Sequence, residues 1–218
     1  STPFRHEIIL DGQSHAAGVY VMDLPGGLGR PFVFVEGIDF GLGPSNQPWQ
    51  NGDFGWREWL GCDPANYPML AMMPNLVDSI VQRGYTPVLI DFEDGTGDLW
   101  DNAALLADIL TFLNDYKTDP RTMVVAGASM GGQLARIALK QLEDLDEAHC
   151  TDLYVSLDSP HCGANVPIGL QQMIQFLAGS GGVVNGLLGA LSSPAARQLL
   201  LLQLGSLSAR NAYQADID

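Results

Sequence analysis

Basic residues are scarce in this sequence. Ten Lys and Arg stand against 25 Asp and Glu, so the formal net charge is −15 and the isoelectric point is about 4.3. A chain of this charge repels phosphates, which argues against nucleic acid as a partner and against charge-driven docking on anionic membranes. Apolar residues make up 46% of the 218 positions, enough for one globular domain with a sizeable core.

Several other features are missing. No apolar run reaches the roughly 18 residues that span a bilayer, so no transmembrane segment is expected. The start has no basic stretch followed by an apolar one, so no signal peptide is predicted. Because the first residue is Ser1 and not Met, a mature form that has lost its signal and a piece of a longer chain are both open. There is no G-x-G-x-x-G after a strand, no P-loop and no metal-binding cysteine spacing. The sequence therefore predicts no cofactor and no metal.

Cysteine is represented three times, and an odd number leaves at least one thiol without an intrachain partner. Cys150 and Cys162 flank a predicted strand and should be too far apart to bridge. Cys62 with Cys162 is the one pairing left open. The preferred interpretation is three small, buried, reduced residues.

The order of apolar segments predicts an α/β fold. Strand patterns alternate with helical spacing from residue 32 to residue 158, which is typical of a mostly parallel sheet with helices on both faces. Ligands in such folds bind at the carboxyl ends of the strands. The expected strands cover residues 4–10, 17–24, 32–35, 87–90, 123–126 and 153–157, and the expected helices cover 70–83, 99–116 and 131–145.

The last part of the chain differs in composition. From residue 166 onward it is rich in Leu, Gly, Gln and Ala, with almost no charge, and helical stretches are expected at 168–178 and 194–206. We therefore divide the chain into an α/β core at 1–165 and a helical lid or cap at 166–218. Two interpretations of this segment remain open. It is either a mobile apolar flap over the strand ends or a set of ordinary packing helices.

The strongest chemical signal is Gly-Ala-Ser-Met-Gly at residues 127–131. It matches the G-x-S-x-G nucleophile elbow, in which a tight, strained strand-to-helix turn exposes the serine. The motif follows a predicted buried strand and opens a predicted helix, which is the required context. Ser129 is the expected nucleophile, and a passive serine in a glycine-rich turn is the alternative.

Two backbone N–H groups should form an oxyanion hole. The first belongs to Met130, at the amino end of the helix. The second should come from the loop after the strand at 32–35, and Ile38 is the expected donor. The alternative for this loop is a simple strand-end turn.

The rest of a catalytic triad is harder to find. Of the four histidines, His6 and His15 precede the elbow and His149 should face the amino-end side of the sheet. His161 alone is downstream and at a strand's carboxyl end, where it could line the cleft and bind substrate or act as the base. Asp158 is the expected acid, because a carboxylate after this strand can reach a histidine delivered from elsewhere. Capping of nearby N–H groups is its alternative role.

These motifs resemble one family. The segments at 32–39, 127–132 and 156–167, above all Ser-Pro-His-x-Gly at 159–163, are similar to those of bacterial, secreted α/β-hydrolases of the lipase and esterase type. The resemblance implies an ester-hydrolysing serine enzyme with a helical lid. It also implies secretion or location in the cell envelope. Lipases commonly carry His-Gly after the third strand, whereas Glu36 stands in place of that histidine.

The resemblance also implies that strands bearing the general base follow the lid. We therefore expect an incomplete hydrolase, with the catalytic histidine on a second polypeptide or on a part outside this chain. The expected substrate is a hydrophobic carboxylic ester. A non-catalytic binding domain, or an acyltransferase or peptidase on the same scaffold, is the alternative.

Two further signals carry alternatives. Carboxylates crowd residues 91–98 and could bind Ca²⁺, although a solvated loop that caps the next helix is the preferred interpretation. Aromatic side chains cluster in the long loop at 37–64, where they either line a pocket near the nucleophile or pack against one another; they are Trp49, Phe54, Trp56 and Trp59.

Overall fold

The computed structural model describes residues 2–22, 24–38, 76–177 and 182–203. Its centre is a six-stranded sheet with the strand order β1-β2-β4-β3-β5-β6. Strands β1 and β2 form an antiparallel hairpin, β2 pairs with β4 antiparallel, and β4, β3, β5 and β6 are parallel to their neighbours. The strands are β1 (Thr2–Leu10), β2 (Gln13–Val21), β3 (Arg30–Val35), β4 (Tyr85–Phe92), β5 (Met123–Ala128) and β6 (Thr151–Leu157).

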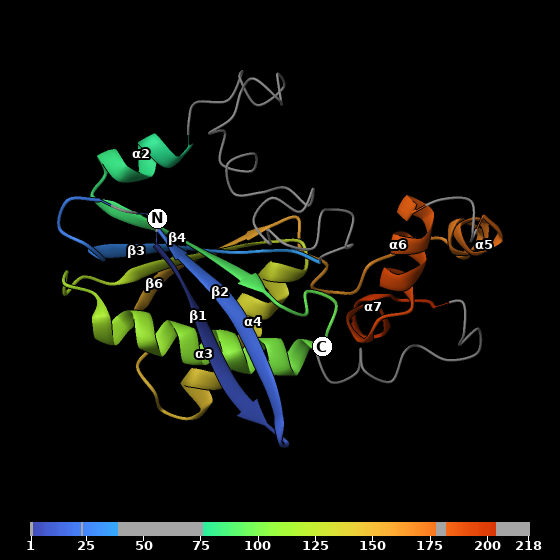
Figure 1. The fold of residues 1–218 in the computed structure, drawn as a ribbon, viewed down its shortest axis with the longest axis horizontal. Coiled ribbons are helices and arrows are strands. Elements are labelled where there is room, and N and C mark those ends of the chain that lie inside the picture. The colour runs from blue at the N-terminus through green and yellow to red at the C-terminus, as the bar shows by residue number, and fades with distance from the viewer. Residues whose placement is uncertain (1, 23, 39–75, 178–181, 204–218) are drawn as a thin grey trace.

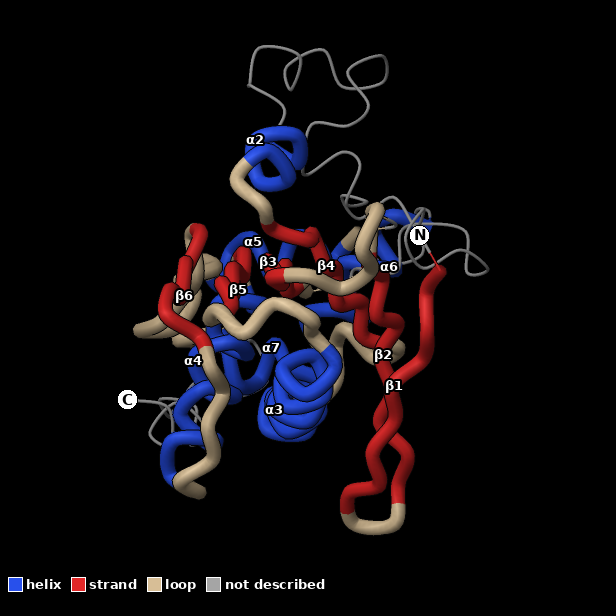
Figure 2. The backbone as a smooth tube through the Cα atoms, turned by 90° about the vertical axis from the view of Figure 1, so that its left-hand side faces the viewer, coloured by secondary structure: helices blue, strands red, loops and turns tan. Residues whose placement is uncertain are grey.

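Helices cover both faces of this sheet. Figures 1 and 2 show α2 on one face, with α3 and α4 on the other. The helices are α2 (Leu76–Gln82), α3 (Leu99–Tyr116), α4 (Met130–Asp144), α5 (Ile168–Phe176), α6 (Gly182–Leu191) and α7 (Pro194–Leu199). The predicted α/β architecture, a mostly parallel sheet between helices followed by C-terminal helices, is confirmed.

The central strands are buried on both faces because their apolar runs have no polar alternation. In β3, Val33 and Val35 point toward α3 and α4, and Phe34 joins the smaller core beneath α2. Val88 and Ile90 of β4 belong to the larger core in the same way. This packing holds the central strands rigidly and therefore fixes the position of the loops that leave their carboxyl ends.

The C-terminal helices differ in part from expectation. The helix expected at 168–178 is present as α5, but the one expected at 194–206 ends at Leu199, and α6 was not predicted. The segment of α6 contains several glycines and β-branched valines, which lower helix propensity. Its helix therefore depends on packing against α5 and α7, which a local pattern does not reveal. In the helix expected at 70–83, residues 70–75 lie outside the described part of the chain.

Backbone hydrogen bonds join the two ends of the segment that contains α5, α6 and α7. Ala164 donates its N–H to the Leu199 carbonyl at 2.6 Å, and Leu201 donates to the Ala164 carbonyl at 3.0 Å. The buried Gln171 side chain donates to the carbonyls of Val166 and Leu202, at 2.9 and 2.8 Å. The chain therefore enters and leaves the α5–α7 segment at one point.

Helix α7 is anchored to the core, whereas α5 is exposed. Gln198 on α7 is buried, and its amide accepts from the Leu99 N–H and donates to the Asp98 carboxylate, both at 2.8 Å. Four large apolar side chains face solvent on α5 and at its C-cap, and Figure 1 shows this helix far from the sheet. They are Leu170, Met173, Phe176 and Leu177.

The cysteines correct one expectation. Cys150 and Cys162 carry free thiols in the described part of the chain, and the other half of the pairing left open, Cys62, lies outside it. Cys162 is also exposed, whereas we expected it to be buried. Cys62 and the aromatic residues at 49, 54, 56 and 59 lie outside the described residues. Among the described helices, none combines the length and the apolarity that crossing a bilayer requires.

Candidate functional site

The turn between β5 and α4 has the backbone geometry of a nucleophile elbow. Ser129 lies between the last residue of β5 and the first of α4, with φ 53° and ψ −125°. A positive φ is strained for a residue with a side chain. The Ser129 side chain is exposed although both its neighbours are buried. The strained turn thus exposes the Ser129 hydroxyl at the carboxyl end of the sheet, between two buried residues.

Two glycines permit the tight turn. A Cβ built on Gly127 would lie 2.2 Å from the Gly131 carbonyl oxygen, and one built on Gly131 would lie 2.2 Å from the Glu36 carbonyl oxygen and 2.4 Å from that of Val35. All three contacts are with backbone atoms, which cannot rotate away. The two glycines of the motif therefore let β5, α4 and the loop after β3 approach one another beside Ser129.

The expected oxyanion donors flank the serine. Met130 is the first residue of α4, so its N–H is one of those that a helix leaves without an intrahelical acceptor, at the positive end of the helix dipole. A Cβ built on Gly37 would lie 3.3 Å from Ser129 Cβ and 3.9 Å from its Oγ. The loop backbone at Gly37 and Ile38 therefore runs directly beside the serine side chain.

Glu36 holds this loop in place. Its carboxylate accepts a hydrogen bond from the Phe92 N–H at 2.5 Å, which joins the end of β3 to the end of β4. Burial, together with the negative charges of Asp91 and Glu36, raises the pKa of Tyr20 to about 12. Glu36 is thus a structural anchor for the backbone at Gly37.

Asp158 lies close to the elbow in the fold. It follows β6 directly, is exposed, and has a positive φ of 49°. The residue before it, Leu157, accepts a hydrogen bond from the Ser129 N–H at 2.9 Å. The structure therefore brings together Ser129, Met130, Ile38 and Asp158, which the sequence had placed at the ends of three different strands.

The histidines are engaged elsewhere. All four belong to the described residues. His6 and His15 on the β1–β2 hairpin face Asp108 and Asp101 on α3, and His149 contacts Glu143 at the other end of β6. His161 bonds through Nε2 to Ser156 Oγ at 2.7 Å and through Nδ1 to Gln133 Oε1 at 3.1 Å.

The acidic loop after β4 serves as a helix cap. Asp94 Oδ1 accepts from the Thr96 N–H and hydroxyl at 3.2 and 3.1 Å, and Asp98 Oδ1 accepts from the Trp100 N–H at 2.8 Å as the N-cap of α3. The Ala195 N–H of α7 donates to the Thr96 carbonyl. Within the described residues, no group of three or more His, Cys, Asp or Glu is arranged to hold a metal ion. Turn and cap contacts account for Asp94 and Asp98, and the Glu93 carboxylate pairs with Arg5 at 2.7 Å.

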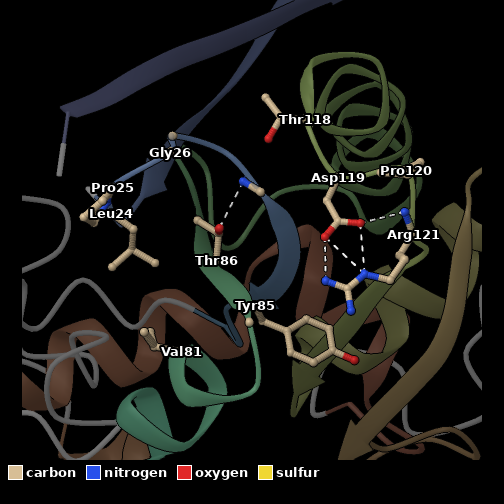
Figure 3. Close-up of a pocket in the computed structure, with 13 residues that line it drawn as sticks. Leu24, Pro25, Gly26, Val81, Tyr85, Thr86, Thr118, Asp119, Pro120 and Arg121 are labelled. Atoms are coloured by element: carbon tan, nitrogen blue, oxygen red, sulfur yellow. Dashed lines mark hydrogen bonds and ion pairs between the residues drawn. The ribbon is translucent and has the colours of Figure 1, made fainter.

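A hollow of about 830 Å³ opens at the other end of the sheet. Figure 3 shows Tyr85 and Thr86, at the amino end of β4, beside the ion pair of Asp119 with Arg121. None of the predicted site residues lines this hollow. Because Ser129 follows the carboxyl end of β5, the hollow is separate from the elbow.

Comparisons with known proteins give structural neighbours only. A scan against protein families found no match, and a search of curated proteins found none either. The mature form of a lipase from Bacillus licheniformis aligns with a TM-score of 0.48 and 19% identity, over 91% of this chain and 62% of that one. Carboxyl esterase 2 from the fungus Tuber melanosporum aligns with a TM-score of 0.46 and 14% identity, over 89% and 56%.

A third solved structure, the bacterial brefeldin A esterase, aligns with a TM-score of 0.45 and 14% identity, over 71% of this chain and 39% of that one. These neighbours are lipases and esterases. This chain spans less than two thirds of the length of each of them. With TM-scores below 0.5, they do not assign a role to any residue of this chain.

Sequence reasoning missed the polar residues behind the elbow. Gln133 is buried on α4, and its amide nitrogen donates to the Pro160 carbonyl at 2.5 Å. Tyr154 on β6 donates its hydroxyl to the Gly132 carbonyl at 2.6 Å. The available signal was a polar side chain one helical turn after the serine, on a face that is otherwise apolar or small.

Proposed function

We propose that this chain carries the nucleophile and the oxyanion hole of a serine hydrolase that cleaves carboxylic esters. The observation that carries the proposal is the backbone of Ser129, a non-glycine residue at φ 53° with an exposed side chain at a strand-to-helix turn. Such strain persists only where the surrounding structure imposes it, and it is typical of functional sites. Two glycines and the loop after β3 impose it here.

In the proposed reaction, Ser129 Oγ attacks the ester carbonyl carbon and its proton passes to a histidine base. The N–H groups of Met130 and Ile38 stabilise the negative charge on the carbonyl oxygen. The alcohol leaves with the proton returned by the histidine, and water then hydrolyses the acyl-serine by the same steps in reverse. Asp158 orients the histidine.

The histidine of this mechanism comes from outside the 218 residues. The ring nitrogens of His161 contact Ser156 and Gln133, and His6, His15 and His149 lie on other parts of the fold. Strand β6 ends the described sheet, and its Leu153 and Leu157 side chains are 52% and 43% exposed. An exposed apolar edge strand is a template for further pairing. A further polypeptide segment that pairs with β6 would supply the base.

The exposed apolar side chains of α5 support a hydrophobic ester as the substrate class, with the α5–α7 segment acting as a lid. Secretion of the protein remains a prediction. Fractionation of the producing cells would test it.

Covalent labelling tests the proposal. A fluorophosphonate probe should modify the complete, folded protein at Ser129, as located by peptide mass spectrometry, and Ser129→Ala should abolish the labelling. Ser192→Ala is the matched control. This serine is exposed, its hydroxyl donates to the Leu188 carbonyl, and it is far from Ser129 in the sequence. Purification from the natural source, followed by a denaturing gel, identifies any second polypeptide. Absence of labelling in that complete material contradicts the proposal.

A non-catalytic binding domain is the second candidate, favoured by the contacts of the four histidines, which join each of them to residues other than Ser129. It predicts that the protein binds hydrophobic esters while Ser129 stays unreactive. An acyltransferase or peptidase on the same scaffold would instead label at Ser129. Product analysis with an ester and an added alcohol or amine separates those activities from hydrolysis.

A further inference from the structure

The loop that follows β6 is fastened to the first turn of α4 by a chain of polar contacts. Gln133 donates to the Pro160 carbonyl at 2.5 Å and accepts from His161 at 3.1 Å. Tyr154 donates to the Gly132 carbonyl at 2.6 Å. These contacts join the helix turn that begins directly after Ser129 to the loop that carries Asp158.

The packing between these two segments is close. A Cβ built on Gly132 would lie 1.9 Å from Ser159 Oγ and 3.0 Å from Ser156 Oγ. Gly132 therefore lets the loop rest directly on the helix turn. Movement of the loop would consequently be transmitted to the turn that carries the Met130 N–H.

The contacts determine the tautomer of His161. Because the Gln133 amide nitrogen faces the Pro160 carbonyl, its oxygen faces His161, and Nδ1 must carry a hydrogen to donate to it. Nε2 is then the acceptor, and the Ser156 hydroxyl at 2.7 Å donates to it. Burial, and to a lesser extent the positive charge of Arg136, lower the pKa of His161. The ring is therefore neutral at pH 7, with its lone pair occupied by Ser156.

We infer that His161 is a positioning residue, whose Nδ1–H contact with Gln133 holds the loop at 158–161 against the first turn of α4. This fixes Ser129 and the Met130 N–H relative to Asp158. The inference rests on the proposed function, since it concerns how the same site is held in its reactive arrangement. It also assigns His161 a role other than that of the proton acceptor for Ser129.

Two isosteric variants test the contact. The amide nitrogen of asparagine lies near the position of histidine Nδ1, and that of glutamine lies near the position of Nε2. His161→Asn should therefore keep the bond to Gln133, while His161→Gln and His161→Ala should lose it. His149→Gln, at the amino end of β6, is the matched control.

The readout is the dependence of the labelling rate on fluorophosphonate concentration, measured for variants whose folding is checked by circular dichroism. In His161→Gln the maximal labelling rate should fall about 10- to 100-fold, the range for a nucleophile displaced by up to about 1 Å. The probe's half-saturation concentration should not change. His161→Asn should stay within about twofold of the wild type, because the donor position is kept. A role in folding alone would lower thermal stability without separating these two variants.

Nuclear magnetic resonance of the unmodified protein gives a second measurement, which does not depend on any variant. Two-bond proton–nitrogen correlations should show His161 at pH 7 as the neutral tautomer with hydrogen on Nδ1. An Nε2–H tautomer overturns the inference, as does a His161→Asn variant that loses as much rate as His161→Gln. A His161→Gln variant that labels at the wild-type rate overturns it and leaves the proposed function intact. A complete wild-type protein that does not label overturns both.

Discussion

The Gly131→Ala substitution probes the elbow directly. The new methyl group would lie 2.2 Å from the Glu36 carbonyl oxygen and 2.4 Å from that of Val35, where carbon–oxygen contacts are ordinarily 3.4 Å or longer. Helix α4 and the loop after β3 must therefore separate by about 1 Å at this point. Overpacking of a core generally costs about 1–3 kcal/mol. We expect the upper end of this range, because both contacts are with backbone.

The same displacement separates the two expected oxyanion donors, Met130 and Ile38, because they lie on the two segments that move apart. A shift of about 1 Å can lower a rate by about 100-fold. The assays are urea unfolding followed by circular dichroism, which gives the free energy of unfolding, and the labelling rate of Ser129 with a fluorophosphonate in the fraction that remains folded.

Gly169→Ala is the matched control for this substitution. Gly169 is the second residue of α5, as Gly131 is of α4, and a Cβ built on it meets no atom within 4 Å. Its replacement should stabilise the protein by up to about 1 kcal/mol, the difference in helix propensity between glycine and alanine. If Gly131→Ala unfolds at the same urea concentration as the wild type and labels at the same rate, the close approach at Gly131 is not what holds the elbow.

Three further predictions concern the scaffold. Gln198→Leu should cost about 1–3 kcal/mol in urea unfolding, because the buried Leu99 N–H loses its acceptor, while the exposed Gln172→Leu should change stability by less than about 0.5 kcal/mol; equal effects would contradict the anchoring of α7. Phe176→Ser should leave the free energy of unfolding unchanged, because the ring is 87% exposed, and a large loss would mean that α5 packs against the core. Hydrogen bonds from Arg121 lower the pKa of Asp119 to about 2 from 3.8, so the stabilisation is present above pH 3.8 and is lost as the pH falls toward 2. The difference in urea midpoint between the wild type and Asp119→Asn should therefore be constant near neutral pH and shrink below about pH 4; a difference that persists at pH 2 would contradict the assignment.

Much of the fold could be predicted because its signals are local. Continuous apolar runs identify β3, β4 and β5, and the helix over residues 99–116 has both its boundaries where apolar spacing and the Asp98 cap indicate. The elbow is similar, since its glycines and serine are adjacent in the sequence. The close approach of β5 and α4 at the two glycines could be inferred from the motif, whereas the contact of Gly131 with Val35 and Glu36 joins segments far apart in the sequence and could not.

The polar contacts behind the elbow could not be predicted, because each joins residues that are far apart in the sequence. Gln133 meets His161 across 28 residues, and Gln198 meets Leu99 across 99. A single glutamine in a helical pattern does not indicate which distant residue its amide will bond to. The helix α6 was missed for a related reason, since its glycines oppose helix formation locally and its neighbours α5 and α7 supply the packing.

The bridge between the two ends of the C-terminal helical segment affects how much the length of that segment can change. Because the chain leaves and rejoins the body at the bridge between Ala164 and Leu200, the length of the intervening chain has little effect on the rest of the fold. Doubling a flexible loop adds only about 0.6 kcal/mol of closure entropy. The stretch that contains α5 and α6 could therefore be lengthened or exchanged between these two fixed points without redesigning the sheet.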